Sequence, residues 1–183
     1  MGLELGPFDA ASAPRGLRVT ASAKRLPAGL MFHFAVTGPV DELLVPAPAL
    51  PTRSDGLWRH LCFEAFLRPT GGDGYLELNF APSAHWAAYA FSDYRAGMKP
   101  ADGIGAPTIS VSQNAARLTL DVTVPLLADN PLSVDRAWDI GLSAVLEGRD
   151  GRLSYWALAH PPGKADFHHG DCFALQLAAA EAS

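Results

Sequence analysis

The chain has 183 residues, a hydrophobic fraction of 49% and a formal net charge of −5 at pH 7. This length predicts a single domain, because domains usually contain roughly 100–200 residues, and it allows a core that needs no disulfide or metal to hold it. The negative charge argues against nucleic-acid binding, which requires a basic surface. The sequence contains no run of about 18 apolar residues, so we expect no membrane span.

The ends of the chain differ in composition from its middle. We expect residues 1–15 to form an N-terminal arm, residues 16–178 a single β-sandwich domain, and residues 179–183 a frayed tail. The arm has acidic residues and prolines but no apolar stretch of the kind found in secretory signal peptides, which favours a cytoplasmic protein. Cys62 and Cys172 would then be reduced, half-buried thiols, although spacing alone does not decide whether they pair.

Short apolar runs of alternating pattern, separated by 15 prolines and 17 glycines, extend along the whole chain. This pattern is typical of an all-β sandwich or barrel, here with roughly ten strands. We also expect turns over 71–74 and 148–151, and a single helical turn that begins at Pro125. The predicted strands cover residues 17–23, 29–37, 40–45, 57–68, 74–80, 85–92, 108–112, 117–124, 138–147, 152–159 and 172–177.

Residues 57–98 carry an unusual set of polar and aromatic side chains. Glu64 in one predicted strand, and Glu77 and Asn79 in the next, alternate with apolar residues that face the opposite way. If these strands pair, the three polar side chains lie side by side. The face that they share is either the solvated outer surface of a half-covered sheet or part of a binding site.

The segment 154–171 holds a second group of reactive side chains. His160, Asp166 and His168 are weak candidates for metal ligands, because they lie in one Pro- and Gly-rich loop without the spacing of a preformed site. The alternative is a structural loop in which Asp166 and His168 bond backbone groups. Haem would need a Met and a His, but neither Met31 nor Met98 is singled out. We therefore expect no cofactor, and haem and divalent metals stay as alternatives.

Catalytic signatures are absent from the sequence. It contains no GxSxG motif and no cysteine in a catalytic context. Glu64 and Glu77 could act as a glycosidase pair only with their carboxyl groups about 5–9.5 Å apart, and the sequence does not give that distance. We expect a protein without enzymatic activity, with glycoside hydrolysis as the alternative.

The polar and aromatic residues of this sequence are of the types found in carbohydrate-binding sites. Such sites stack sugar rings on aromatic side chains and hold the hydroxyls with acidic, amide and guanidinium groups. Arg95, next to Tyr94, is suited to present its planar fork to a ligand, or else it forms an ion pair with Glu64 or Glu77. The nine candidates are Trp58, Glu64, Glu77, Asn79, Trp86, Tyr89, Tyr94, Arg95 and Trp156, although any single Trp could instead be a core residue.

Three stretches of the sequence, LWRHLCFEAFL, GYLELNFAPSAHWAAYAFSDYRAGM and LSAVLEGRDGRLSYWALAHPPGKADFHH, resemble the DOMON-like domains of bacteria. Those domains are related to the family 9 carbohydrate-binding modules and to DOMON domains that bind sugar or haem. The resemblance runs from about residue 16 to 177 and implies an immunoglobulin-like or jelly-roll antiparallel β-sandwich with a ligand pocket on one sheet.

The resemblance also implies residue roles. In the sugar-binding relatives, two aromatic side chains clamp a terminal sugar, and acidic, amide and arginine side chains bind its hydroxyls. Glu77, Asn79 and Arg95 match this set by type, as does a pair drawn from Trp58, Trp86 and Trp156. In the haem-binding branch a Met and a His ligate the iron.

Together these features predict a binding protein for a small molecule, a carbohydrate or similar polyol, held on the face formed by residues 58–95. The alternative from a different class is a structural or protein-interaction domain with no small ligand. The identity of the ligand, the oligomeric state and the role of the 160–171 loop are not specified by the sequence.

Overall fold

The computed structural model of the protein describes residues 2–132 and 136–179, which form a two-layer antiparallel β-sandwich with twelve strands and three short 3-10 helices. The predicted all-β sandwich is therefore confirmed. No helix in these two ranges is long and apolar enough to cross a membrane. The strands are β1 (Leu3–Pro7), β2 (Arg18–Leu26), β3 (Gly29–Thr37), β4 (Cys62–Pro69), β5 (Tyr75–Phe80), β6 (Trp86–Phe91), β7 (Lys99–Pro100), β8 (Thr108–Asn114), β9 (Arg117–Pro125), β10 (Trp138–Glu147), β11 (Leu153–Ala157) and β12 (Leu175–Leu177).

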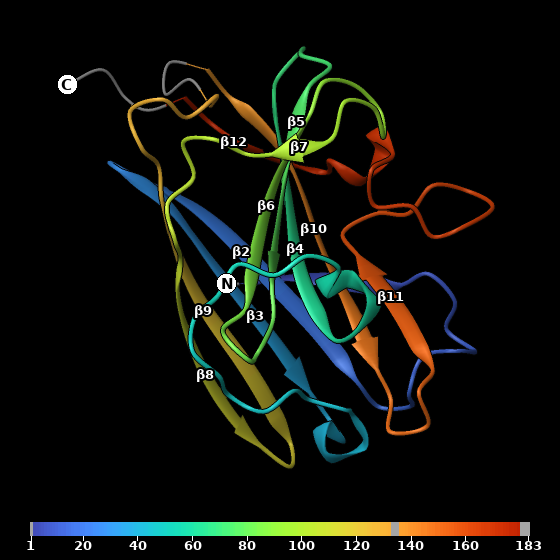
Figure 1. Ribbon diagram of the computed structural model, residues 1–183. Helices are drawn as coiled ribbons and strands as arrows, with labels where there is room; N and C mark the ends of the chain where they lie inside the picture. The colour runs from blue at the N-terminus through green and yellow to red at the C-terminus, as the bar shows by residue number, and fades with distance from the viewer. Residues whose placement is uncertain (1, 133–135, 180–183) are drawn as a thin grey trace.

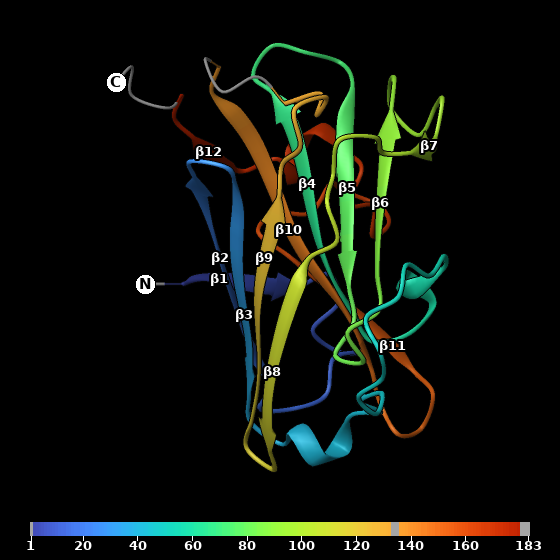
Figure 2. The same cartoon turned by 60° about the vertical axis from the view of Figure 1, so that its left-hand side comes forward.

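The two layers are seen edge-on in Figure 2. The first sheet has the order β8-β9-β3-β2-β1, and the second has the order β7-β6-β5-β4-β10-β11 (Figure 1). The short strand β12 pairs with the part of β10 that β11 leaves free. Strand β1 belongs to both layers, because Leu3–Leu5 pair with β2 while Gly6 and Pro7 pair with β11.

This dual pairing shows that part of the predicted N-terminal arm is a strand that links the two sheets. The sequence of β1, LELGP, is short and has only one buried side chain, Leu5, so it lacks the alternation that marks the other strands. The predicted frayed tail lies almost wholly at residues 180–183, outside the described ranges.

The core lies between the sheets and is built from the inward side of each strand. Phe32 and Phe34 of β3 are fully buried and meet Phe80 and Phe63 of the opposite sheet, with ring centroids 5.7 and 5.1 Å apart. These residues are the ones that the period of two placed on the inner face. Their alternation therefore determines which side of β4 and β5 remains for the outer surface.

Three predicted strands contain a 3-10 helix. Val40–Glu42 form a 3-10 helix, η1, and not a strand, between Pro39 and the isolated bridge at Leu43. The predicted strand over 57–68 is divided into the 3-10 helix η2 (Leu57–Arg59), which begins after the left-handed Gly56, and β4, which begins after His60 has returned to an extended conformation. The segment over 172–177 likewise contains a 3-10 helix, η3 (Gly170–Cys172), before β12.

The predicted helical turn at Pro125 is also wrong. Pro125 is the last residue of β9 and lies opposite Gly29 of β3. Strand β8 pairs with β9 only as far as Thr123, so the missing N–H of Pro125 leaves no gap in that ladder. The φ of proline, which its ring fixes at about −65°, is tolerated at such a strand end.

Candidate functional site

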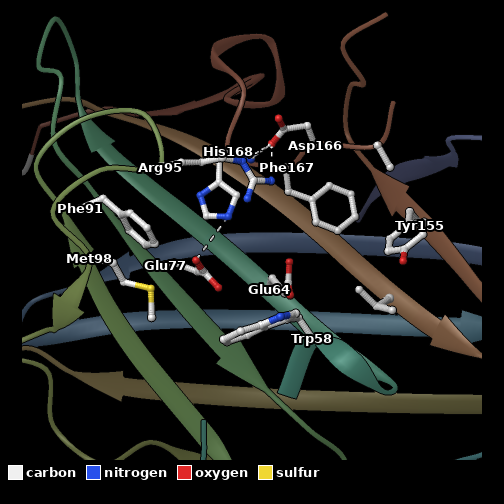
Figure 3. A pocket seen from close by; sticks show the side chains of 12 residues that line it. Trp58, Glu64, Glu77, Phe91, Arg95, Met98, Tyr155, Asp166, Phe167 and His168 are labelled. Atoms are coloured by element: carbon white, nitrogen blue, oxygen red, sulfur yellow. Dashed lines mark hydrogen bonds and ion pairs between the residues drawn. The ribbon is translucent and has the colours of Figure 1, made fainter. Parts of the chain in front are cut away.

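The outer face of the second sheet holds a cavity of about 350 Å³ (Figure 3). Strands β4, β5 and β10 provide its floor, η2 one wall, the turn between β6 and β7 another, and the segment from 158 to 173 a third. Residues far apart in the sequence thus meet on one face. The lining residues are Trp58, Glu64, Glu77, Phe91, Arg95, Met98, Val145, Tyr155, Ala165, Asp166, Phe167 and His168.

Two carboxyl groups form the polar floor of this cavity. In the β4–β5 register Glu64 lies opposite Asn79, and Glu77 lies opposite Phe66, so that the two glutamates are diagonal neighbours on one face. The predicted alignment of Glu64, Glu77 and Asn79 is therefore present. This face is not a solvated outer surface, however, because Glu64 is only 2% exposed and Glu77 only 5%.

Each floor carboxyl has a protein partner. Asn79 donates to Glu77 Oε1 at 2.7 Å, while its own Oδ1 is buried without a hydrogen-bond partner. Ser143 of β10 donates to Glu64 Oε2 at 3.4 Å. Burial raises the pKa of Glu64 well above its usual value, and repulsion from Glu77 adds to that shift. Burial also raises the pKa of Glu77, against the opposing effects of Asn79 and Arg95.

Asp166 ties the 158–173 segment to the turn between β6 and β7. Its Oδ1 accepts hydrogen bonds from Arg95 Nε at 3.2 Å and Arg95 Nη2 at 2.8 Å, and its Oδ2 accepts one from Tyr94 Oη at 2.5 Å. Burial alone would raise the pKa of Asp166, but the bonds from Arg95 and Tyr94 outweigh it and hold that pKa below its usual value. Asp166 is therefore an anion with a dedicated cation.

Hydrogen bonds fix both the backbone and the side chain of Arg95. Its φ is +52°, in the left-handed region that non-glycine residues seldom adopt. The hydroxyl of Tyr75 accepts a hydrogen bond from Arg95 N at 3.1 Å, and Asp166 fixes the guanidinium. The predicted alternative ion pair of Arg95 with Glu64 or Glu77 does not form, because Asp166 takes that position.

His168 forms the upper wall of the cavity in Figure 3. Its Nδ1 lies 2.7 Å from the hydroxyl of Tyr75, and its Nε2 lies 3.7 Å from Glu77 Oε2. Burial lowers the pKa of His168 to about 4, and the nearby charge of Arg95 acts in the same direction. The imidazole is therefore neutral at pH 7.

Aromatic rings surround the two floor carboxyls. Trp58 lies below them in Figure 3, with its ring edge-to-face against Tyr89 at a centroid distance of 5.9 Å. Phe91 stacks on Tyr75 at 4.7 Å and lines one side of the cavity, next to Met98. Phe167 and Tyr155 line the other side, with their centroids 6.1 Å apart. The cavity thus combines flat apolar surfaces with buried acids, a mixture that is typical of ligand sites.

The structure places the nine residues predicted for the site in four different positions. Trp58, Glu64, Glu77 and Arg95 line the cavity. Asn79 and Tyr89 lie directly behind it, the first bonded to Glu77 and the second donating to Asp55 Oδ1 at 2.6 Å. Tyr94 reaches Asp166, but its side chain is largely exposed and lines a neighbouring hollow. Trp86 and Trp156 pack in the core between the sheets, where they cannot touch the same ligand as Trp58.

The weak metal candidates are also separated by the fold. His160 lies beside Phe8, and its Nε2 is 2.8 Å from the Gly6 carbonyl, whereas Asp166 and His168 line the cavity. In the described ranges, no three His, Cys, Asp or Glu side chains come together in a way that could hold a metal ion. Cys62 and Cys172 are free and buried.

A haem iron does not fit the residues present in this cavity. Met98 and His168 both line it, whereas Met31 lies on β3 in the other sheet. Both ring nitrogens of His168, however, face other side chains, Tyr75 and Glu77. An iron ion would have to displace one of these partners to reach the imidazole.

Six lining residues were not predicted, and two were predicted only as metal ligands. Phe91 and Val145 could have been found from strand alternation, because each shares its strand face with a polar candidate in the neighbouring strands. Tyr155 lies opposite Val145 in β11 and could have been found in the same way, whereas Phe167 carries no such signal, since the covering segment has no regular period. The remaining two are Met98 and Ala165, and the two weak metal candidates are Asp166 and His168.

Comparison with known proteins gives a likeness of fold. No protein-family model matches the sequence, and no curated protein matches it. Among solved structures, a protein from Bacteroides uniformis that has been proposed to bind carbohydrate is similar with a TM-score of 0.54 and 13% identity, over 90% of this chain and 82% of that one.

A second similar structure is a family 9 carbohydrate-binding module from Caldicellulosiruptor kristjanssonii in complex with glucose. Its TM-score is 0.53 at 12% identity, and the match covers 94% of this chain and 81% of the module. At these identities the likeness establishes the fold. The chain is a β-sandwich of the same kind as these two proteins.

Proposed function

We propose that this protein binds a small carbohydrate, or a similar polyol, in the cavity on the outer face of the second sheet. The observation that carries the proposal is the joining of flat aromatic surfaces and buried carboxyl groups in one cavity. Sugar rings have apolar faces that stack on aromatic side chains and hydroxyls that require hydrogen-bond partners. Trp58 supplies the first property, and Glu64, Glu77 and Arg95 supply the second.

The size of the cavity agrees with this ligand class. Its volume of about 350 Å³ is at the small end of the range of roughly 300–1,000 Å³ that is usual for ligand sites. It suits a monosaccharide or the end of a longer chain. The fold of the two similar structures supports the proposal as well, since one of them is a carbohydrate-binding module in complex with glucose, and the resemblance to bacterial DOMON-like domains is in keeping with it.

A structural or interaction domain is the second candidate, and one observation favours it. The ion pair between Arg95 and Asp166 joins two covering segments, so these side chains have a role without any ligand. That role accounts for Asp166 and Tyr94, but it does not account for the burial of Glu64 and Glu77 at an open cavity. Ligand binding therefore explains the buried carboxyl groups of the cavity floor better than a purely structural role does.

A thermal-shift screen followed by isothermal titration calorimetry tests the proposal. The probes are glucose, galactose, xylose, glucosamine, N-acetylglucosamine and glucuronate. A ligand at about 100 times its dissociation constant stabilises the protein by about 2.7 kcal/mol, which raises the melting temperature by several degrees. We expect a shift with at least one sugar in the wild type, a loss of that shift in Trp58→Ala, and an unchanged shift in Leu50→Ala. Leu50 is 84% exposed and does not line the cavity. No shift with any probe would favour the structural domain.

A further inference from the structure

The described residues that line the cavity are unbalanced in charge. They include three acids, Glu64, Glu77 and Asp166, but only one arginine, Arg95. A site for an anionic ligand would show the opposite balance, because a carboxylate or phosphate is held by guanidinium, ammonium or backbone N–H groups.

The single arginine is already engaged. Two of its nitrogens, Nε and Nη2, lie 3.2 and 2.8 Å from Asp166 Oδ1, and Asp166 also accepts from Tyr94. Arg95 and Asp166 therefore neutralise each other. The two floor glutamates remain, with hydrogen bonds from an asparagine and a serine but with no side-chain cation bonded to either of them.

Histidine does not supply the missing charge. His168 lies 3.7 Å from Glu77, yet burial keeps its pKa at about 4, so that the imidazole is neutral near pH 7. The raised pKa of each floor glutamate shows the same imbalance: burial acts against the charged form of both, and repulsion from Glu77 adds to this effect at Glu64. A positive group placed between them would relieve both effects.

The walls of the cavity are also suited to a cation. Trp58, Phe91, Tyr155 and Phe167 surround the floor carboxyls in Figure 3. Aromatic faces attract ammonium groups through the ring quadrupole, and the attraction is greater where water is excluded. Glu64 and Glu77, at 2% and 5% exposure, are sheltered in this way.

We infer that the ligand of this cavity is cationic, and that an amino sugar with a free ammonium group is the class that fits best. The inference rests on the proposed carbohydrate function and specifies it further. In this arrangement the sugar ring lies against Trp58 and the ammonium lies between Glu64 and Glu77, where it donates to both carboxylates. A neutral sugar offers the two carboxyl groups only uncharged hydroxyls, and a sugar acid finds no free cation among the described residues of the floor.

Calorimetric titrations at about pH 6.5 test this charge selectivity. The four probes share one type of sugar ring and differ in charge. Glucose and N-acetylglucosamine are neutral, the second through acylation of its amine, whereas glucosamine is cationic and glucuronate is anionic. We expect glucosamine to bind at least about tenfold more tightly than glucose, because its bonds to the carboxylates are charge-assisted. N-acetylglucosamine should not share this advantage, and glucuronate should bind most weakly.

Variants then test whether the floor glutamates cause the preference for glucosamine over glucose. In the double variant Glu64→Gln, Glu77→Gln, the advantage of glucosamine over glucose should disappear. In Glu42→Gln, an exposed glutamate in η1, it should persist. Melting temperatures verify that each variant is folded, and we expect the double variant to fold because glutamine resembles the protonated glutamate that burial favours.

The outcomes separate this inference from the proposed function. If glucose and glucosamine bind equally well, or if the preference survives in the double variant, the inference is wrong while carbohydrate binding stands. If the wild type binds none of the four sugars, both are wrong. A preference for glucosamine that only the floor variant abolishes would establish the cationic ligand.

Discussion

Arg95 Nη2 lies 2.8 Å from Asp166 Oδ1, and this ion pair connects two segments that are 71 positions apart in the sequence. The first is the turn between β6 and β7, and the second is the irregular segment that covers the outer face of the second sheet. The covering segment lies over the floor glutamates, which are 2% and 5% exposed. The pair therefore helps to convert a sheet face into a cavity.

Asp166→Ala should destabilise the protein by about 1–3 kcal/mol, because Tyr94 and Arg95 lose a buried charged acceptor. The loss is smaller than for a fully buried pair, since the Arg95 side chain is 49% exposed and can turn to water. Urea denaturation measures the difference. Glu4→Ala is the control: its ion pair with Arg18 is exposed on both sides, and its loss should cost less than about 1 kcal/mol. Equal losses in the two variants would mean that the Asp166 contacts contribute no more than a surface pair.

The hydroxyl of Tyr75 serves two elements of the site at once. It lies 2.7 Å from His168 Nδ1 and accepts from Arg95 N at 3.1 Å. Tyr75→Phe should therefore cost about 1–3 kcal/mol, as is usual when buried polar partners are left unsatisfied. Tyr155→Phe, which removes a hydroxyl from a side chain that is 37% exposed, should change stability by less than about 0.5 kcal/mol. Chemical denaturation compares them, and a cost for Tyr155→Phe equal to that for Tyr75→Phe would contradict the account.

The raised pKa of Glu64 predicts a pH dependence of stability. Its folded pKa lies above the unfolded value of about 4.3, so the stability that protonated Glu64 confers is complete below about pH 4.3 and is lost as the pH rises through the folded pKa. Glu64→Gln has no such titration. The stability of this variant relative to wild type should increase between about pH 4.5 and pH 8.

Urea melts of both proteins at the two pH values measure that difference. Other titrating groups near Glu64, namely Glu77, Cys62, Arg95 and His168, are common to both proteins and cancel to first order. Leu50→Ala, which changes an exposed side chain that does not titrate, should differ from wild type by the same amount at both pH values. A pH-independent difference for Glu64→Gln would show that this carboxyl is ionised in the folded protein as it is in the unfolded chain.

Trp58 and Trp156 should differ in what they contribute. Trp58 lines the cavity and is partly exposed, so Trp58→Ala should lower sugar affinity at least about tenfold while the fold persists. Trp156 is buried between the sheets and donates to Ser154 Oγ at 3.0 Å, so Trp156→Ala should cost about 3–5 kcal/mol. Calorimetric titration and denaturation, performed on both variants, test the contrast. Similar effects of the two substitutions would mean that Trp58 is a core residue.

The sequence predicted the sheets well because alternation is a local signal. Phe63 and Glu64 point to opposite sides of β4 whatever the partner strand, so the inner and outer faces could be assigned in advance. The same reasoning failed for β1, whose five residues include one buried side chain. Its pairing with both β2 and β11 depends on tertiary structure.

Of the cavity, only the floor could be predicted from the sequence. Glu64 and Glu77 follow from strand alternation, but their burial depends on a covering segment of irregular structure. An ion pair of Arg95 with Glu64 or Glu77 was the alternative to its binding a ligand, whereas the structure pairs Arg95 with Asp166. No periodicity relates residue 95 to residue 166, so spacing in the sequence could not identify that pair.

Methionine methyl groups provide the most direct test that this cavity is the binding site. Met98 lines the cavity, whereas Met31 lies on β3 in the opposite sheet and is 40% exposed. The protein is labelled with [¹³C-methyl]methionine, the signals are assigned with Met98→Leu and Met31→Leu, and glucosamine and glucose are titrated in turn. The account predicts that the Met98 signal shifts in a saturable manner and that the Met31 signal does not move. A saturable shift of Met31 with no change at Met98 would place the site elsewhere, and unmoved signals at high sugar concentration would contradict carbohydrate binding in this cavity.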